Sequence, residues 1–473
     1  MSTRESAHVA IIPSPGMGHL IPFMELAKLL VSHHHFSVTF IIPSFGTSSS
    51  KSHESVLQIL AENLHVVVLP PAQSSGFGST GASTEMIIGL TIAQSLPLIR
   101  DALVNLTTTH NLVSVVVDPF GLDVGEISKE LKVPLYMYFG TAAMNLLFTF
   151  YLPKLDQEVK CEFREMTDPV ELPGCVPLHG RDFADPFQDR SSETYKQFLE
   201  QSKRSSDLVT GILINSYLEL EPGAIQVLQG DDLGCRPVYP IGPIIQSIAS
   251  NKVDDGSEYL RWLDRQPSGS VLFVSFGSGG TLSCAQLHEL ALGLEMSGQR
   301  FLWIVRPPSD TSSCPSYCGG PSQDDPFKFL PNGFIDRTRD RGLVVPSWAC
   351  QIKILSHEST GAFLTHCGWN SVLESITHGM LLIAWPLYAE QKTNAVLLTD
   401  GLKVALRPKI NENGLVVHDE VSKVVRSLMQ GDEGKRIRDR ARELMESAHR
   451  AISDGGSSTK ALDQVATRWR DHH

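Results

Sequence analysis

The stretch Ala362-Phe363-Leu364-Thr365-His366-Cys367-Gly368-Trp369-Asn370-Ser371 decides the fold of the C-terminal half. Its apolar first part predicts a buried strand that ends at His366, and Gly368 permits the tight turn that follows. A helix is expected to start near Asn370. The unpaired N–H groups and the dipole of a helix start attract anions, so this turn is a candidate phosphate site.

Apolar runs of similar length recur on both sides of this unit, with helical patterns such as Ala285–Met296 between them. They lack the two-residue alternation of half-exposed strands, which indicates parallel sheets covered on both faces. The predicted strands are His8–Pro13, Phe36–Pro43, Leu64–Leu69, Val113–Val117, Leu135–Phe139, Val271–Phe276, Phe301–Val305, Leu343–Val345, Ala362–Thr365 and Leu382–Trp385. We therefore expect an α/β protein with two Rossmann-like parallel-sheet domains and a ligand site between them.

The domain limits follow from changes in composition. A polar Ser/Asn/Asp stretch predicts a linker at 246–256, between an N-terminal domain (1–245) and a C-terminal domain (257–455). The last helix, 456–473, is expected to pack back on the N-terminal domain. Pro307–Pro326, which is dense in Pro, Ser, Gly and Asp, predicts a surface loop.

The composition of the 473-residue chain is that of a globular protein, with 42% hydrophobic and 19% charged residues. A net charge of −12 argues against nucleic-acid binding. No secretory signal is expected, because the first apolar stretch, His8–Pro13, is short and is not followed by a small-residue cleavage site. Met137–Leu152 falls short of the ~20 residues that span a bilayer. A cytoplasmic protein without a membrane span is expected. The eight cysteines are predicted to be free thiols. Cys314 and Cys318 alone are weak evidence for a metal site, because no second pair at ligand spacing accompanies them.

The loop Ser14-Pro15-Gly16-Met17-Gly18-His19 follows the first predicted strand, and a helix is expected from about Pro22. Ile21 stands where a dinucleotide fingerprint would have its third glycine, and no Gly-Lys-Ser/Thr is present. His19 should face the cleft. The ordinary pKa of an imidazole, about 6.5, makes this side chain a competent proton acceptor at cellular pH. A solvent-facing histidine at a helix start is the ordinary alternative.

Asp118 follows the predicted strand Val113–Val117, so it should also lie at the edge of the cleft. A carboxylate beside an imidazole fixes its tautomer and stabilises the imidazolium. Without a partner, Asp118 would more often be a turn or capping residue. A His-Asp pair without a Gly-x-Ser-x-Gly elbow favours base catalysis on a bound hydroxyl over hydrolysis.

The segment from Trp348 to Gln391 carries the strongest chemical signal. His366, Asn370 and Ser371 can donate to a diphosphate, Glu374 can accept from ribose hydroxyls, and Trp348 offers a flat face to a base. Each residue also has an ordinary interpretation: Trp348 as core, Asn370 and Ser371 as helix caps, and Glu374 as a solvated helix residue.

In this order and spacing, Trp348 to Gln391 resembles the signature box of the plant family-1 UDP-glycosyltransferases, which have the GT-B fold. The resemblance covers the whole chain and is strongest to hydroquinone and related phenylpropanoid glucosyltransferases. The similar motifs are Leu152-Pro153-Lys154-Leu155-Asp156, Leu172-Pro173-Gly174-Cys175, Val274 to Gly280 and Trp385 to Gln391.

The resemblance implies an inverting transfer of glucose from UDP-glucose to a small phenolic or flavonoid acceptor, with no metal or cofactor. His19 would be the general base and Asp118 its partner. The donor would be held by Ser278, Trp348, Ala349, Gln351, His366, Gly368, Trp369, Asn370, Ser371, Glu374, Glu390 and Gln391. Gln391, rather than histidine, favours glucose over galactose.

The chain departs from the family pattern at Cys350, where the box normally has proline, and at Met380-Leu381. On the acceptor side, Glu85 matches a glutamate of the group, but Ser83, Ile87 and Gln94 stand where relatives carry arginine. The loss of that charge predicts a roomier or more apolar acceptor site, so a flavonoid-sized acceptor is an option beside a small phenol. Both an O-glucoside and a C-glucoside stay open as products. An NAD(P)-dependent oxidoreductase and a non-catalytic sugar-nucleotide binder are the alternative functions.

Overall fold

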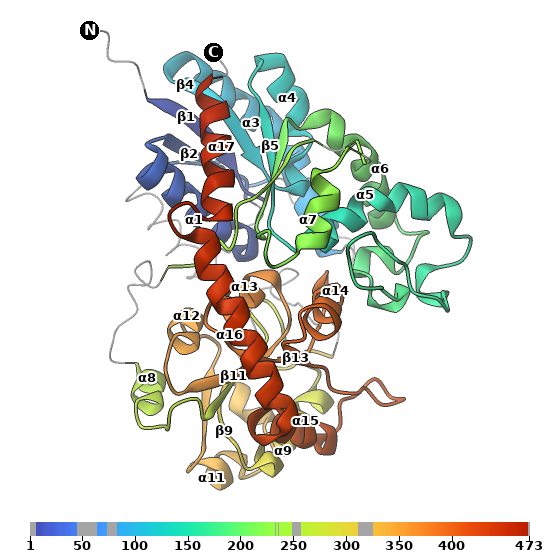
Figure 1. Cartoon of the computed structure of the whole chain (residues 1–473), viewed down its shortest axis with the longest axis vertical. Helices are drawn as coiled ribbons and strands as arrows, with labels where there is room; N and C mark the ends of the chain where they lie inside the picture. The colour runs from blue at the N-terminus through green and yellow to red at the C-terminus, as the bar shows by residue number, and fades with distance from the viewer. Residues whose placement is uncertain are drawn as a thin grey trace.

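Two parallel β-sheets, each covered by helices on both faces, stand one above the other in the long direction of the molecule (Figure 1). The computed structural model describes residues 6–44, 64–72, 83–231, 233–234, 236–247, 257–310 and 325–471. The predicted linker 246–256, the loop Pro307–Pro326 and Cys235, Cys314 and Cys318 lie partly or wholly outside these residues.

The N-terminal sheet has seven strands in the order β3-β2-β1-β4-β5-β6-β7, and every pair is parallel. Most of its strands are buried along nearly their whole length, as the continuous Val/Ile runs predict. The strands are β1 (Ala7–Ile12), β2 (Ser37–Ile42), β3 (His65–Val68), β4 (Asn111–Val117), β5 (Leu135–Phe139), β6 (Gly211–Ile214) and β7 (Val238–Pro240).

The C-terminal sheet has six strands in the order β10-β9-β8-β11-β12-β13, again all parallel. The strands are β8 (Val271–Ser275), β9 (Arg300–Val305), β10 (Gly342–Pro346), β11 (Thr360–Thr365), β12 (Leu381–Ala384) and β13 (Ala405–Leu406). The predicted α/β class with two Rossmann-like sheets is confirmed.

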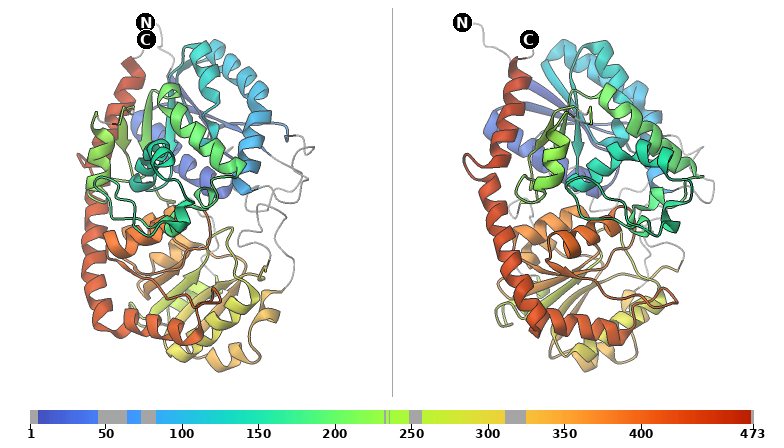
Figure 2. Two further views of the ribbon diagram at one scale, coloured as in Figure 1. Left: turned by 90° about the vertical axis from the view of Figure 1, so that its right-hand side faces the viewer. Right: turned by 45° about the vertical axis from the view of Figure 1, so that its right-hand side comes forward.

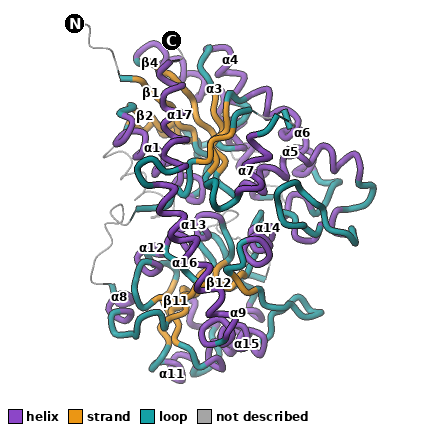
Figure 3. The backbone as a smooth tube through the Cα atoms, in the orientation of Figure 1, coloured by secondary structure: helices purple, strands orange, loops and turns teal. Residues whose placement is uncertain are grey.

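Helices and short helical turns connect the strands (Figure 3). The helices are α1 (Met17–His34), α3 (Thr84–Thr109), α4 (Val124–Leu131), α5 (Ala143–Glu158), α6 (Glu193–Leu208), α7 (Pro222–Gln229), α8 (Glu258–Leu263), α9 (Cys284–Ser297), α11 (Phe334–Thr338), α12 (Gln351–Leu355), α13 (Trp369–Thr377), α14 (Gln391–Val396), α15 (His418–Gln430), α16 (Asp432–Ile452) and α17 (Ser457–Asp471). The 3₁₀ turns are η1 (Pro119–Gly121), η2 (Phe163–Glu165), η3 (Gly180–Asp182), η4 (Asp185–Phe187) and η6 (Pro326–Phe329), and a π turn, η7, covers Leu397–Gly401.

All ten predicted strands are present, with ends that differ by one or two residues. The sequence prediction missed β6, β7 and β13, which are only two to four residues long. It also placed the start of α1 near Pro22, whereas the helix begins at Met17 and carries Pro22 inside it. A proline is tolerated there because the carbonyl that it leaves without a helical donor has another partner.

The topology fixes where ligands can bind. In each sheet the strand order reverses once, between β1 and β4 and between β8 and β11. Ligands of open α/β sheets bind at the carboxyl ends of the strands beside such a reversal. His19 follows β1, Asp118 follows β4 and His366 follows β11, so these residues stand at the two reversals.

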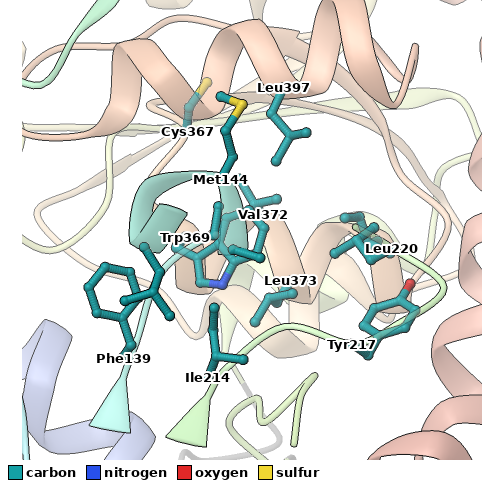
Figure 4. Packing of buried hydrophobic residues seen from close by; sticks show 14 of the residues in the cluster. Phe139, Met144, Ile214, Tyr217, Leu220, Cys367, Trp369, Val372, Leu373 and Leu397 are labelled. Atoms are coloured by element: carbon teal, nitrogen blue, oxygen red, sulfur yellow. The ribbon is translucent and has the colours of Figure 1, made fainter. Parts of the chain in front are cut away.

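One continuous cluster of buried apolar side chains joins the two halves (Figure 4). Phe139, Met144 and Ile214 come from the N-terminal half, and they pack around Trp369 and Leu373 of α13. A shared apolar core of this kind fixes the two sheets relative to each other more firmly than a polar contact would.

The C-terminal helices run along one side of both halves (Figure 2). α16 packs on α13 and α15, whereas α17 packs on β7, β4 and α1. Trp469 of α17 is fully buried and meets the rings of Phe36 and Tyr136 edge-on, with centroids 5.7 and 5.3 Å away. The last helix thus completes the core behind the N-terminal sheet.

Among the described residues, one helix, α3, is long and apolar enough to cross a membrane by length and composition alone. Met137–Leu152, which the sequence analysis considered, is divided between β5 and α5 and forms no single long helix. Ile92, Ile99 and Leu103 of α3 are buried, and the helix packs against β4 and α4. Part of the apolar surface of α3 is therefore buried in the core of the N-terminal half.

Replacing Trp469 by alanine should lower the free energy of unfolding by about 3–5 kcal/mol, the usual cost of removing a buried Trp or Phe side chain. Thermal and denaturant unfolding of W469A would measure the loss. Q464A, on the exposed face of the same helix, is the matched control. Equal stability of the two variants would contradict the role of Trp469 in the N-terminal core.

Candidate active site

His19 and Asp118 meet at the carboxyl end of the N-terminal sheet. β1 and β4 are neighbours in register, with Ile12 opposite Val117, so the loops that follow them lie side by side. His19 Nδ1 lies 3.1 Å from Asp118 Oδ2. The side chain of His19 is 27% exposed and that of Asp118 is buried. The structure therefore brings the predicted pair together and leaves the imidazole accessible.

Three further contacts hold the Asp118 carboxylate. The Ser14 backbone N–H donates to Oδ2 at 3.0 Å and its hydroxyl donates to Oδ1 at 2.6 Å. The Phe120 N–H also donates to Oδ1, at 3.1 Å. Asp118 is thus both the cap of η1, its ordinary interpretation, and the partner of His19. The sequence analysis missed the role of Ser14, although its place in the loop directly after the first predicted strand was a signal.

The electrostatic surroundings favour the protonated form of His19. Burial lowers the pKa of this imidazole, but the hydrogen bond and charge of Asp118, and then the charge of Glu390, outweigh it, so the pKa is raised above 6.5. Glu390 belongs to the C-terminal half, so both halves act on His19. The other ring nitrogen, Nε2, is left to take a proton from a ligand.

A row of aromatic rings from the N-terminal half begins at His19. Phe120 packs edge-on against His19, with ring centroids 5.7 Å apart. Phe198 meets Phe120 at 6.0 Å, and Phe187 meets Phe198 at 5.6 Å. Phe120 is partly exposed and was not predicted. A flat apolar acceptor would find ring surfaces here.

Gln351, Ser371 and Glu374 form a cluster on the C-terminal side. Gln351 Nε2 donates to Ser371 Oγ at 2.9 Å and to Glu374 Oε2 at 2.7 Å. Glu374 is buried, and burial raises its pKa to about 7 against the opposing hydrogen bond from Gln351. Neither ordinary interpretation fits, because Ser371 makes no capping bond and Glu374 is not solvated.

His366 occupies a narrow slot between two glycines. A Cβ on Gly277 would lie 2.4 Å from His366 Nε2, and one on Gly368 would lie 2.6 Å away. Gly277 also has a φ of +74°. Burial lowers the pKa of His366 to about 4, with a smaller effect from Arg306, so the imidazole is neutral at pH 7. Its Nδ1 is buried without a hydrogen-bond partner among the described residues.

The start of α13 lies directly after His366 and Gly368. Its first N–H groups have no acceptor within the helix, as at every helix start. Ser278 is exposed in the loop after β8, next to Gly277, and its carbonyl accepts from Arg306. The residues predicted to bind the diphosphate therefore gather at the reversal between β8 and β11.

Trp348 is 52% exposed, so its ordinary interpretation as a core residue is wrong. It follows β10 through Ser347, which has a φ of +65°. Ala349 and Cys350 after it are buried, and Gln351 begins α12. The indole therefore stays available at the surface beside the Gln351 cluster.

Trp369 and Asn370 use their side chains for contacts between the two halves. Trp369 is 3% exposed, and its Nε1 donates to Asn215 O at 2.7 Å. Only its main chain is left for a sugar. Asn370 Nδ2 donates to Gly18 O at 3.1 Å, which uses one of its two N–H groups and leaves the other to donate to a ligand. The helix-cap interpretation of Asn370 is wrong.

Glu390 and Gln391 lie at the start of α14. Gln391 Oε1 accepts from the N–H groups of Leu387 and Tyr388 at 2.8 and 3.1 Å, which leaves its NH₂ group to donate to a ligand. Asn394 Nδ2 lies 3.5 Å from Glu390 Oε1. Burial raises the pKa of Glu390 against several opposing contacts, the charge of His19 among them.

The predicted acceptor residues Glu85 and Ile87 lie in the first turn of α3 and are partly exposed. Ser83 caps this helix by accepting from Met86 N at 3.2 Å. The charge of Glu85 reaches Glu390 and contributes to its raised pKa. Glu85, from the N-terminal half, therefore lies close enough to Glu390, near the end of the signature box, for the two charges to interact.

Within the described part of the chain, no group of three or more His, Cys, Asp or Glu side chains could hold a metal ion. Its five cysteines, Cys161, Cys175, Cys284, Cys350 and Cys367, are free. Buried Cys367 has a pKa raised to about 12 by desolvation, which makes it a poor nucleophile.

Comparison with known proteins agrees with this geometry. The family model described as UDP-glucoronosyl and UDP-glucosyl transferase matches residues 232–427. A hydroquinone glucosyltransferase of Rauvolfia serpentina is 53% identical over 464 residues, which cover 98% of each chain.

Solved structures extend the similarity to the whole fold. A UGT2 of Phytolacca americana complexed with UDP-2fluoro-glucose and pterostilbene superposes with a TM-score of 0.89 at 51% identity, covering 98% of this chain and 99% of that one. A UDP-glucosyltransferase of Polygonum tinctorium capable of glucosylating indoxyl gives a TM-score of 0.91 at 46% identity, with 99% and 100% covered. With two parallel-sheet domains and relatives this similar along its whole length, the chain belongs to the plant family-1 UDP-glycosyltransferases, and it is an enzyme of that family.

Proposed function

We propose that the chain is an inverting glucosyltransferase that moves glucose from UDP-glucose to the hydroxyl of a phenolic or flavonoid acceptor. The observation that carries this proposal is the His19–Asp118 pair, 3.1 Å apart, beside the start of α13. The hydrogen bond from Asn370 to Gly18 keeps the start of α13 and the first turn of α1, which carries His19, together. A base from one half can thus act on a sugar held by the other.

The reaction needs one proton transfer and one displacement. His19 Nε2 takes the proton of the acceptor hydroxyl while that oxygen forms a bond to the anomeric carbon. The bond from the anomeric carbon to the phosphate oxygen breaks, and its electron pair leaves with UDP. Asp118 stabilises the imidazolium, and attack opposite the leaving group inverts the anomeric centre.

Neutral donors and a helix start would stabilise the leaving UDP. His366, with its pKa near 4, donates a hydrogen bond without carrying a charge. The N–H groups at the start of α13 meet the phosphate oxygens. Ser278 and Ser371 add hydroxyls, so the diphosphate is bound mainly by dipoles.

The uridine would lie against the Gln351 cluster. Exposed Trp348 stacks on uracil, and the main chain at Ala349 and the side chain of Gln351 contact the nucleoside. Glu374 accepts from the ribose hydroxyls. Since its pKa is near 7, hydroxyl donors would also help to keep this carboxylate ionised.

The acceptor would be a phenol or a larger aromatic alcohol. The relatives above are named for hydroquinone and indoxyl, and one was solved with pterostilbene. The aromatic surface of Phe120 and Phe198 and the apolar Ile87 suit such rings. An O-glucoside is the favoured product, and a C-glucoside is the alternative, because the phenolate can attack through its ring carbon. Acid hydrolysis separates them, since only the O-glucoside is cleaved.

Glu390, the Gln391 amide and the main chain at Trp369 would hold the glucose. No cofactor or metal is needed for this scheme, in which UDP-glucose is a substrate. A cytoplasmic location and the limits 1–245, 257–455 and 456–473 remain predictions from the sequence.

His19→Ala should lower kcat with a phenol by about 10²–10⁴-fold, the usual contribution of a general base. The assay is UDP release with UDP-glucose and a panel of phenols and flavonoids, with products identified by mass spectrometry. H33A, an exposed histidine on the same helix, should behave as wild type. Near-normal turnover of H19A would show that another group is the base.

Asp118→Asn should move the acid limb of the pH profile to lower pH. The active base is neutral His19, so kcat/KM falls as the pH drops through its pKa, which Asp118 holds above 6.5. Without the charge of Asp118, burial dominates and that pKa falls. The profile of kcat/KM for D118N against wild type measures the shift, and the exposed D123N is the control. An unmoved acid limb would contradict the coupling.

Glu374→Ala should weaken UDP binding by about 10–100-fold, the size of a lost hydrogen bond to a charged group. Calorimetry with UDP and 2′,3′-dideoxy-UDP tests the ribose contact directly. Wild type should prefer UDP, whereas E374A should bind the two ligands equally. E358A, at an exposed position, should keep the preference. An equal preference in E374A and wild type would place the ribose elsewhere.

A further inference from the structure

The segment from Asp182 to Phe187 bridges the two halves beside the predicted sugar site. It covers the end of η3 and all of η4, so it belongs to the N-terminal half. Its two aromatic side chains and its two carboxylates have opposite surroundings, with the aromatic rings in the core and the carboxylates toward the C-terminal half.

The aromatic side chains anchor the segment in the N-terminal core. Phe183 and Phe187 are buried, and their ring centroids lie 4.6 and 5.0 Å from that of Phe148 on α5. Phe187 also touches Phe198, which in turn meets Phe120 beside His19. The segment thus packs directly against Phe198, which together with Phe120 forms the proposed acceptor surface.

Asp185 forms hydrogen bonds with the turn that precedes Glu390. Its Oδ2 accepts from the Ala389 N–H at 2.9 Å, and its own N–H donates to Ala389 O at 3.3 Å. Its Oδ1 accepts from Lys392 Nζ at 2.9 Å. One residue of the N-terminal half therefore binds both main-chain polar groups of Ala389.

Ala389 needs this support because its backbone is left-handed, with a φ of +53°. Residues with a Cβ seldom adopt that conformation unless their surroundings impose it. The two residues that follow Ala389 are Glu390 and Gln391. A change at Ala389 would rotate the start of α14 and move both side chains.

We infer that Asp185 is a positioning residue of the donor-sugar site: by holding Ala389, it sets Glu390 and Gln391 against the glucose of UDP-glucose. The inference rests on the proposed function, in which these two side chains hold the sugar. It makes the sugar site dependent on the N-terminal half, while the uridine contacts at Trp348 and Gln351 stay within the C-terminal half.

A general role in docking the two halves falls to other contacts. Asp182 Oδ1 accepts from Arg407 at 2.9 Å, and Asp182 O accepts from Thr393 Oγ1 at 2.9 Å. Neither contact touches the turn before Glu390. The ion pair between Asp185 and Lys392 is partly exposed, so it contributes little energy by itself. The bond to the Ala389 N–H is the one that fixes the turn.

Asp185→Ala should lower kcat/KM for UDP-glucose by about tenfold or more, as expected for a lost charge-assisted hydrogen bond. The dissociation constant of UDP should change little, because the proposed uridine contacts are made by Trp348 and Gln351, which Asp185 does not hold. D185N, whose amide oxygen can still accept from Ala389, should recover most of the activity. The ratio of kcat/KM for UDP-glucose and UDP-galactose should fall in D185A.

D182A is the matched control, because it removes a side-chain carboxylate of the same segment that also pairs across the two halves. Its UDP-glucose to UDP-galactose ratio should equal that of wild type, and K392M should be affected only slightly. Equal effects in D182A and D185A, or a parallel loss of UDP affinity in D185A, would overturn the inference. If wild type transferred no glucose to any phenol, the proposed function would fail. Binding would then still test the inference. D185A should bind UDP-glucose more weakly than wild type does, relative to UDP, and an unchanged ratio of the two affinities would overturn the inference.

Discussion

The hydrogen bond from Asn370 Nδ2 to Gly18 O, 3.1 Å long, joins the two parts of the candidate site: the start of α1, which carries His19, and the start of α13. Pro22 makes it possible. A proline has no N–H, so Gly18 O, four residues earlier in α1, has no helical donor. The first turn of α13 supplies the donor from the other half, and Trp369 adds a second bond to Asn215 O. The first turn of α1, which carries His19, and the start of α13, which would face the diphosphate in the proposed function, are thus fixed to each other.

The sequence predicted the parts of the fold that local physics determines. Long apolar runs gave ten of the strands, because burial on both faces requires an uninterrupted apolar sequence. The pairing of His19 with Asp118 was also predictable, since both follow strands that end at the same edge. The chain had no comparable pattern for β6, β7 and β13, whose two to four residues are too few to show a period.

Contacts between distant positions could not be predicted in this way. Asp185 and Ala389 are far apart in sequence, and nothing local in the Asp182–Phe187 segment indicates a partner in the other half. The start of α1 was placed too late for a related reason, because the residue that satisfies Gly18 O comes from the C-terminal half. Trp369 was predicted to hold the sugar, but its indole lies in the core shared by the halves, which only the packing reveals.

The charges around the cleft have opposite signs at its two ends. Asp118 and Glu390 raise the pKa of His19, which makes this end favourable for a proton. The other end has a neutral His366, the start of α13 and, close enough to lower the pKa of His366, Arg306, which makes it favourable for negative charge. In the proposed reaction the proton moves toward the carboxylates and the electron pair moves toward the helix start. Both movements therefore follow a field that exists before the substrates bind, and preorganised charge of this kind lowers a barrier without any rearrangement during the reaction.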